Sequence, residues 1–247
     1  MDVRLAVVVL LAFVVESSLG FGATVVTVAL ASQFAPIDVV LPIFVPLNVL
    51  LSAYLVVRYR RDVDRGMLFR RVLPAMLVGL PVGIFVFRRL DARALRAVFG
   101  AFVLVLSALQ LAQQFRPSAR GKRPLSRWVA TGLLFLAGAI HGAFATGGPL
   151  AVYVSGREMA DDKARFRATL SALWLVLNIV LVTVYVRAGS VRLATLQHSL
   201  VLGIALVAGT VVGEWTHRRV SVRAFTIGVY VVLVGAGLLL VVRAAMG

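Results

Sequence analysis

The sequence predicts an all-α polytopic membrane protein, and three observations support this prediction. First, 61% of its 247 residues are hydrophobic and the mean hydropathy is +0.97, whereas soluble domains are about 45–50% apolar. Second, the apolar residues form long runs, most of them close to the roughly 20 residues that a helix needs to cross a bilayer. Third, the basic residues stand almost wholly between these runs, as in loops that set membrane topology. We therefore expect a multi-pass protein of the cell membrane.

Eight apolar segments follow one another along the chain, which predicts about eight membrane segments. The first and the fifth are longer than one crossing requires, and the third is short. The polar connectors are too short for a soluble domain, and the longest of them are rich in charge, as expected for loops. The apolar segments are 5–31, 36–57, 72–87, 97–115, 128–154, 168–186, 195–213 and 224–242.

Charge and cysteine content restrict the partners and cofactors that we expect. The net charge of +16 does not indicate a nucleic-acid partner, because the basic residues lie in loops between membrane segments. The sequence contains no cysteine, which excludes disulfides, thiolate metal sites and iron–sulfur clusters. We expect no cofactor and no metal, and we expect the lipid bilayer and a small anion as partners. The oligomeric state stays open.

The first and fifth apolar segments are each interrupted by glycine, hydroxyl residues and one ionisable side chain. The interruptions lie at 16–24 and 141–149. Such residues allow a helix to unwind at membrane depth and to expose backbone donors. Pro149 favours the first turn of a new helix, where its missing N–H costs nothing. We therefore predict a broken helix in both places, which either crosses the membrane once or re-enters as a hairpin.

The two interrupted segments begin the halves of an internal duplication. At an offset of 122 residues the interruptions match at three positions, Gly20 and Gly142 among them. After a short insertion the offset becomes 130, and a Gly-xxx-Gly motif followed by an arginine pair recurs at 79–89 and 209–219. We assign the Gly-xxx-Gly motifs to close helix contact across the two halves.

The duplication divides the chain into a first repeat, 1–115, a basic linker loop, 116–127, and a second repeat, 128–247. Such duplications are frequent in secondary transporters. If both interrupted segments re-enter, most basic residues fall on one face of the membrane, in agreement with the positive-inside rule, and the halves are inverted repeats. If both cross once with tilt, the charge bias is weak. We favour the inverted arrangement.

The two interruptions form the candidate binding site for a small anion. Unwound turns free backbone N–H groups, and the positive end of a helix dipole attracts negative charge. Two such helix ends facing each other would hold an oxyanion, with hydroxyl groups as extra donors. Close helix packing and a proline kink are the alternative explanation of these glycines. The candidate substrate-binding residues are Ser17, Ser18, Gly20, Gly22, Thr24, Asn48, Gly142, Thr146, Gly147, Gly148 and Asn178.

Glu16 and His141 stand beside the interruptions and are the candidates for proton coupling. A carboxylate inside the membrane is costly and therefore a functional candidate. A buried carboxyl group tends to stay neutral until it is solvated, and histidine titrates near neutral pH. For His141 simple packing is the alternative. Asn48 and Asn178 hold equivalent positions in the two halves, where each either bonds a neighbouring helix or lines the site.

Several features occur together over the chain: a glycine-rich interruption in each half, Arg167-Ala168-Thr169 at the start of the segment that contains Asn178, and a late Gly-xxx-Gly before a basic pair. In this combination the sequence resembles, over roughly 8–242, the sulfite exporter TauE/SafE family of membrane permeases. The resemblance implies a two-repeat helical carrier for small sulfur-containing anions such as sulfite or organosulfonates, without cofactor or covalent chemistry. Two departures lie where substrate would bind, namely a shorter glycine run at 20–23 and a histidine at 141.

We therefore expect a secondary transporter that exports such an anion by alternating access around a mid-membrane site. An anion channel through the same path is the alternative, and it would conduct far faster than a carrier. An intramembrane enzyme with Glu16 and His141 as acid and base is a further alternative, but it lacks an evident nucleophile or metal cluster. We predict no enzymatic activity. Uninterrupted helices through both stretches would contradict the transporter prediction.

Overall fold

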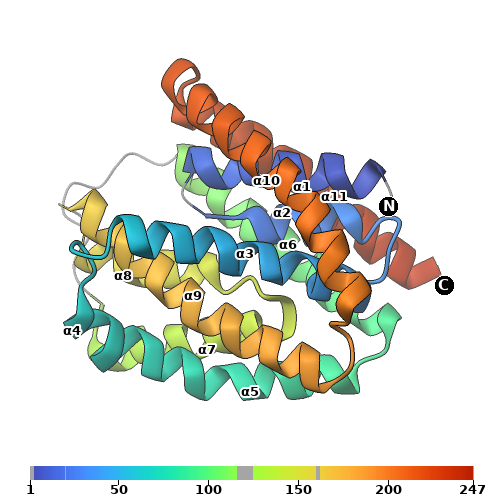
Figure 1. Cartoon of the computed structure of the whole chain (residues 1–247), viewed down its shortest axis with the longest axis horizontal. Coiled ribbons are helices and arrows are strands. Elements are labelled where there is room, and N and C mark those ends of the chain that lie inside the picture. The colour runs from blue at the N-terminus through green and yellow to red at the C-terminus, as the bar shows by residue number, and fades with distance from the viewer. Residues whose placement is uncertain (1–2, 20, 116–124, 160–161, 247) are drawn as a thin grey trace. The chain divides into compact units, whose positions relative to one another are not determined.

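The described part of the chain is helical, with short connectors between the helices (Figure 1). The computed structural model describes residues 3–19, 21–115, 125–159 and 162–246. The π-helical turn Leu68–Val72 joins α4 to α5. The helices are α1 (Val3–Leu19), α2 (Ala23–Ala31), α3 (Ile37–Arg58), α4 (Arg65–Met67), α5 (Leu73–Arg89), α6 (Ala92–Phe115), α7 (Arg127–Phe144), α8 (Gly148–Glu158), α9 (Lys163–Arg187), α10 (Leu193–Arg219) and α11 (Val222–Met246).

Among the described residues, seven helices are long and apolar enough to cross a membrane, with α4, the π-helical turn and α5 taken as one. The prediction of an all-α polytopic membrane protein is therefore confirmed. Eight segments were predicted, and the difference is the first one, because it is divided between α1 with 17 residues and α2 with 9. The candidate spans are 37–58, 65–89, 92–115, 127–144, 164–187, 195–216 and 223–246.

Both interrupted segments are broken helices, as predicted. In the first, α1 ends at Leu19 and α2 begins at Ala23. In the second, α7 ends at Phe144 and α8 begins at Gly148. Each break therefore spans three residues, and both fall inside the glycine-containing stretches.

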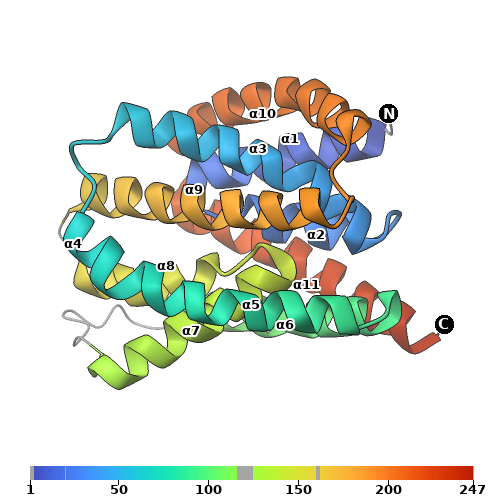
Figure 2. The same cartoon turned by 60° about the horizontal axis from the view of Figure 1, so that its bottom comes forward.

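The second helix of each broken segment folds back along the first, so both segments are hairpins (Figure 2). Val8 near the start of α1 shares an apolar cluster with Ala31 at the end of α2. Ala130 near the start of α7 and Val154 in the second half of α8 line the same groove. A helix rises about 1.5 Å per residue, so an unbent segment would hold the members of each pair tens of ångströms apart. We name these elements the α1–α2 and α7–α8 hairpins.

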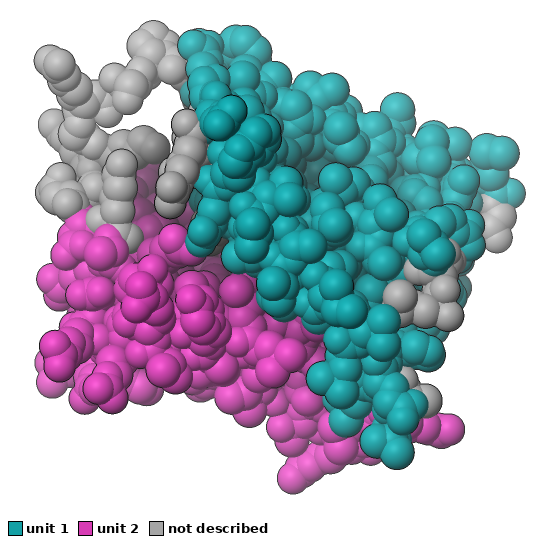
Figure 3. Space-filling model, turned by 45° about the horizontal axis from the view of Figure 1, so that its top comes forward, with its two compact units in different colours: residues 1–44, 90–118, 193–247 teal, residues 45–89, 119–192 magenta. Residues whose placement is uncertain are grey.

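The helices form two compact units, and each unit takes elements from both predicted repeats (Figure 3). Unit 1 comprises residues 1–44, 90–118 and 193–247, and unit 2 comprises residues 45–89 and 119–192. Within unit 1 the helix α1 packs against α10, and within unit 2 the helix α7 packs against α5. Each hairpin thus packs on a helix from the other repeat.

The Gly-xxx-Gly motifs make these two helix contacts possible. In unit 2 a Cβ atom at Gly79 or Gly83 would overlap the backbone of α7, and in unit 1 a Cβ at Gly209 or Gly213 would collide with α1. Only glycine permits so close an approach of two helix backbones. The prediction of close helix contact across the two halves is therefore confirmed. The carbonyl groups approached belong to Phe135 and Ala139 in unit 2 and to Leu10 and Val14 in unit 1.

Candidate anion-binding site

The break in the α7–α8 hairpin leaves the N-terminus of α8 without a side-chain cap among the described residues. Ala145 closes α7 in the left-handed conformation, with φ at 53°, and its N–H donates to the carbonyl of His141 over 2.7 Å. That conformation costs a residue with a Cβ atom about 1–2 kcal/mol, and such backbone strain clusters at functional sites. Because Pro149 has no N–H, the donors of the first turn of α8 are the amides of Gly148 and Leu150.

Gly147 brings this helix end against α7. A Cβ atom at Gly147 would overlap the carbonyl group of Ala137 and would lie 3.0 Å from the Cβ of His141. The chain can therefore turn back so tightly only with glycine at this position. As a result, the N-terminus of α8 lies beside His141.

Three buried polar side chains accompany this helix end. The exposed fractions are 2% for His141, 3% for Thr146 and 2% for Asn178. Within the described residues no hydrogen bond reaches the two ring nitrogens of His141, the Oγ1 of Thr146 or the Oδ1 of Asn178, although Asn178 is the polar neighbour of the imidazole. A buried polar group without a partner costs about 1–3 kcal/mol. Each of these groups needs a polar partner that the described residues do not supply, such as a water molecule or a polar ligand.

Trp174 also lies at the N-terminus of α8, and the sequence did not lead us to predict it as a site residue. Its ring stacks on the imidazole of His141, with ring centroids 5.6 Å apart and planes 18° apart. A Cβ atom at Gly148 would lie 3.8 Å from its Cζ2 atom. Trp174 is one helical turn before Asn178 on α9, so both lie on one face of that helix. Its position within an apolar segment was the signal that could have identified it. Tryptophans of membrane proteins prefer the membrane interfaces, so one inside a span is unusual.

In the α1–α2 hairpin the N-terminus of α2 is already bound to a carboxylate. Gly22 is the N-cap residue, with φ at 110°, a conformation that favours glycine. The N–H of Ala23 donates to Oε2 of Glu16 over 2.9 Å. The acid that the sequence marked as a proton-coupling candidate thus satisfies the end of the helix that would otherwise attract an anion. Gly20 lies outside the described residues.

Glu16 and His141 hold equivalent positions in the two hairpins. The first helices end at Leu19 and Phe144 and the second helices begin at Ala23 and Gly148, so equivalent residues are 125 apart. This separation is three residues larger than the offset of 122 at which identical residues of the two interruptions align. One hairpin therefore carries an acid beside its second helix and the other carries an imidazole. Of the two second helices, α2 has its N-terminus bound by Glu16, whereas α8 has no side-chain cap and lies beside buried polar atoms without partners among the described residues.

Three of the predicted binding residues take part in helix packing. The Oγ of Ser18 donates to the carbonyl of Gly213 over 3.0 Å, and Ser17 lies against the same glycine. A Cβ atom at Gly142 would overlap the carbonyl of Leu80 in α5. These contacts support the packing interpretation that the sequence left open.

Thr24 and Asn48 are buried and have interactions of their own. Asn48 belongs to the part of α3 that lies in unit 2, and Thr24 belongs to α2 in unit 1. Of the predicted residues, the structure therefore gathers His141, Thr146, Gly147, Gly148 and Asn178 around one helix end. We name these five residues, with Trp174, the α8 site.

Comparison with known proteins gives one family and one curated relative. The family model described as Sulfite exporter TauE/SafE matches residues 5–240. A protein of Comamonas testosteroni named "Probable inner membrane transporter protein TsaS" is 26% identical over 168 residues, which are 68% of this chain and 68% of that protein. No solved structure shows significant similarity to the chain. The resemblance seen in the sequence is therefore confirmed.

Proposed function

The chain belongs to the sulfite exporter TauE/SafE family and is a multi-pass transporter of the cytoplasmic membrane, and from this premise we propose that it exports small sulfur-containing anions such as sulfite or an organosulfonate. The family supports the transport of such anions. The composition of the α8 site supports anion recognition without a resident cation. Export, rather than uptake, follows the description of the family.

The α8 site is where we propose that the anion binds. The single observation that carries this proposal is that an uncapped helix N-terminus meets buried polar atoms that lack partners among the described residues. Backbone amides and the helix dipole favour a negative ligand. Hydrogen bonds to a charged ligand contribute about 1.5–3 kcal/mol each after the loss of water is counted.

Each residue of the site has a chemical role in this proposal. The hydroxyl of Thr146 and the Nδ2 group of Asn178 donate to sulfur-bound oxygen atoms. The Oδ1 of Asn178, which lacks a partner among the described residues, can only accept a hydrogen bond, for example from an N–H of His141. The Trp174 ring, stacked on His141, offers an apolar surface to the organic part of a sulfonate. His141 in one hairpin and Glu16 in the other are the residues that would carry a coupling proton, because each stands beside the start of a second helix.

The proposal also includes alternating access between inverted repeats. It is supported by the repetition of one packing arrangement, since a Gly-xxx-Gly helix of each repeat meets the first helix of the other repeat's hairpin. Such duplicated architecture is typical of secondary transporters in which one repeat moves against the other. A carrier of this kind has a turnover far below channel conductance.

Thr146→Val in reconstituted proteoliposomes tests the site. Valine has the shape of threonine without the hydroxyl, so it removes a buried group that lacks a partner among the described residues, and protein stability should stay constant or rise. The loss of one bond to an anion predicts a half-saturating concentration about 10–100 times higher. Flux of sulfite, a sulfonate, thiosulfate and a carboxylate is measured against concentration, together with the melting temperature.

The matched control is Thr210→Val, which removes another hydroxyl without a described partner, from α10. Its flux should equal that of the unchanged protein. If Thr146→Val transports sulfite and sulfonate normally, the α8 site is wrong. If no sulfur-containing anion moves at all, or if flux reaches channel rates and ignores a pH gradient, the proposed function is wrong.

A further inference from the structure

A groove of about 340 Å³ in unit 2 runs between α5, α7 and α8. Its walls are apolar, and its mouth carries arginine. It lies at the opposite end of α7 from the α8 site, since it is lined by residues 127–135 and not by the break. The wall residues include Val72, Val78, Leu134, Phe135 and Val154, and the charged residues of the mouth are Arg70, Arg71, Arg127 and Glu158.

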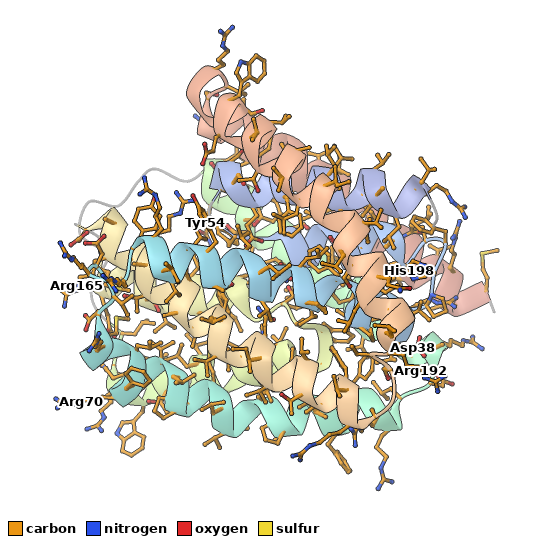
Figure 4. The ribbon with its side chains drawn as sticks, viewed as in Figure 1. Asp38, Tyr54, Arg70, Arg165, Arg192 and His198 are labelled. Carbon is orange, nitrogen blue, oxygen red and sulfur yellow. The ribbon has the colours of Figure 1, made fainter. Side chains whose placement is uncertain are left out.

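We propose that this groove binds an anionic phospholipid, with the phosphate at the arginines and an acyl chain along α5 and α7. The charge of the mouth supports this occupant. Arg71 pairs with Glu158 over 2.6 Å, whereas Arg70 and Arg127 have no ion-pair partner among the described residues. The mouth therefore keeps two uncompensated positive charges, and Figure 4 shows Arg70 projecting outward from the end of unit 2.

The apolar part of the groove has the position that a lipid tail requires. Both α5 and α7 are candidate membrane spans, so their exposed faces meet the acyl chains. Val78 is 66% exposed and Phe135 is 38% exposed, and both line the groove. The groove thus continues from the arginines toward the middle of the two spans.

Trp128 marks the level of the lipid headgroups. It is 86% exposed and stands next to Arg127 at the start of α7. Tryptophan collects at the interface between hydrocarbon and water. Arg127 therefore lies at phosphate depth, and basic pockets between membrane helices on the cytoplasmic side are known binding places for anionic headgroups.

The size of the groove argues against a partner helix as its occupant. One turn of an α-helix about 10 Å wide and 5.4 Å long already fills about 400 Å³, more than the groove contains. A single acyl chain is narrower than a helix, and only the part of it next to the phosphate would lie in the groove. The lipid would touch α5 and both helices of the α7–α8 hairpin, and so it would hold the hairpin against its packing partner.

Lipid binding to the purified full chain tests the inference. Native mass spectrometry in detergent gives dissociation constants for phosphatidylglycerol and for phosphatidylcholine with the same acyl chains. Each arginine near the headgroup contributes about a fivefold gain in affinity. We expect phosphatidylglycerol to bind about 10–30 times more tightly, and Arg70→Gln with Arg127→Gln to abolish this preference.

The matched control is Arg88→Gln with Arg89→Gln, at the other end of α5, which should keep the preference. Arg127→Gln alone should reduce the preference for phosphatidylglycerol about fivefold. This single variant replaces the double variant if the latter does not fold. Equal affinity for the two lipids in the unchanged protein, or a preference that Arg127→Gln leaves undiminished, would overturn the inference. So would full competition by glycerol phosphate without acyl chains, because that result would indicate a site for free phosphate.

Discussion

Gly148→Ala is the most informative change at the α8 site, because the structure leaves room for it. The added Cβ atom would have the Cζ2 of Trp174 as its nearest neighbour, at 3.8 Å, which is an ordinary van der Waals contact. Gly148 does not have a positive φ angle, so alanine meets no backbone strain there. Alanine is preferred to glycine in helices by up to about 1 kcal/mol. We therefore expect an unchanged or slightly higher melting temperature.

The same methyl group should weaken transport strongly. It would lie against the Trp174 ring, beside the first amide of α8 that the proposed anion would contact. Losing one charge-assisted hydrogen bond costs about 1.5–3 kcal/mol, and every 1.4 kcal/mol is a factor of about ten in affinity. The half-saturating concentration for sulfite should therefore rise about 10–100 times. Flux into proteoliposomes measures the half-saturating concentration, and calorimetric titration of the purified protein measures the dissociation constant for sulfite.

Gly132→Ala is the matched control, because a Cβ atom there has nothing within 4 Å, in α7 of the same hairpin. It should transport like the unchanged protein. Gly147→Ala is unsuitable, since its Cβ would overlap the carbonyl of Ala137 and a loss of activity would only report misfolding. Normal binding and flux in a stable Gly148→Ala protein would refute the placement of the anion at α8.

Two further changes test the coupling residue and the helix packing. Glu16→Gln keeps an oxygen acceptor for the N–H of Ala23, which lies 2.9 Å from the carboxylate, but the amide cannot exchange a proton. Transport should therefore persist and lose its response to a pH gradient. A response equal to that of the unchanged protein would exclude Glu16 from coupling. Gly83→Ala would drive a methyl group into the backbone at Ala139 and should destabilise the protein by about 1–3 kcal/mol. The melting temperature of Gly83→Ala is compared with that of the control Gly228→Ala, whose Cβ would meet nothing within 4 Å. Equal stability of the two variants would contradict the close contact between α5 and α7.

Local chemistry made the breaks predictable. Glycine, hydroxyl residues and Pro149 oppose a continuous helix, and the two helix ends at Leu19 and Phe144 fall inside the stretches that contain them. The Gly-xxx-Gly motifs were predictable for a similar reason, because small residues in apolar segments serve close helix contact. The duplication led us to expect contact across the two halves, and the structure identified the partners as α7 for the first motif and α1 for the second.

Other features depend on which atoms meet after folding. Gly142 and Gly147 look alike in sequence, yet Gly142 makes room for Leu80 of another helix while Gly147 permits the reversal onto Ala137. The equivalence of Glu16 and His141 was hidden because residue identities match at a different offset from the helix ends. Trp174 carried only a weak signal, and its contact with His141 joins two helices that are distant in sequence.

The sequence by itself determined that this is a helical membrane protein, and that the first and fifth apolar segments are broken helices. Hydrophobic length and glycine content are sufficient for this, because lipid requires every backbone group to be bonded within a helix unless a break is built in. Only the tertiary structure decided that each broken segment is a hairpin, that Glu16 fills the end of α2, and that α8 keeps its end uncapped. Those outcomes depend on distances between residues far apart in the chain, which the periodicity of a sequence does not record.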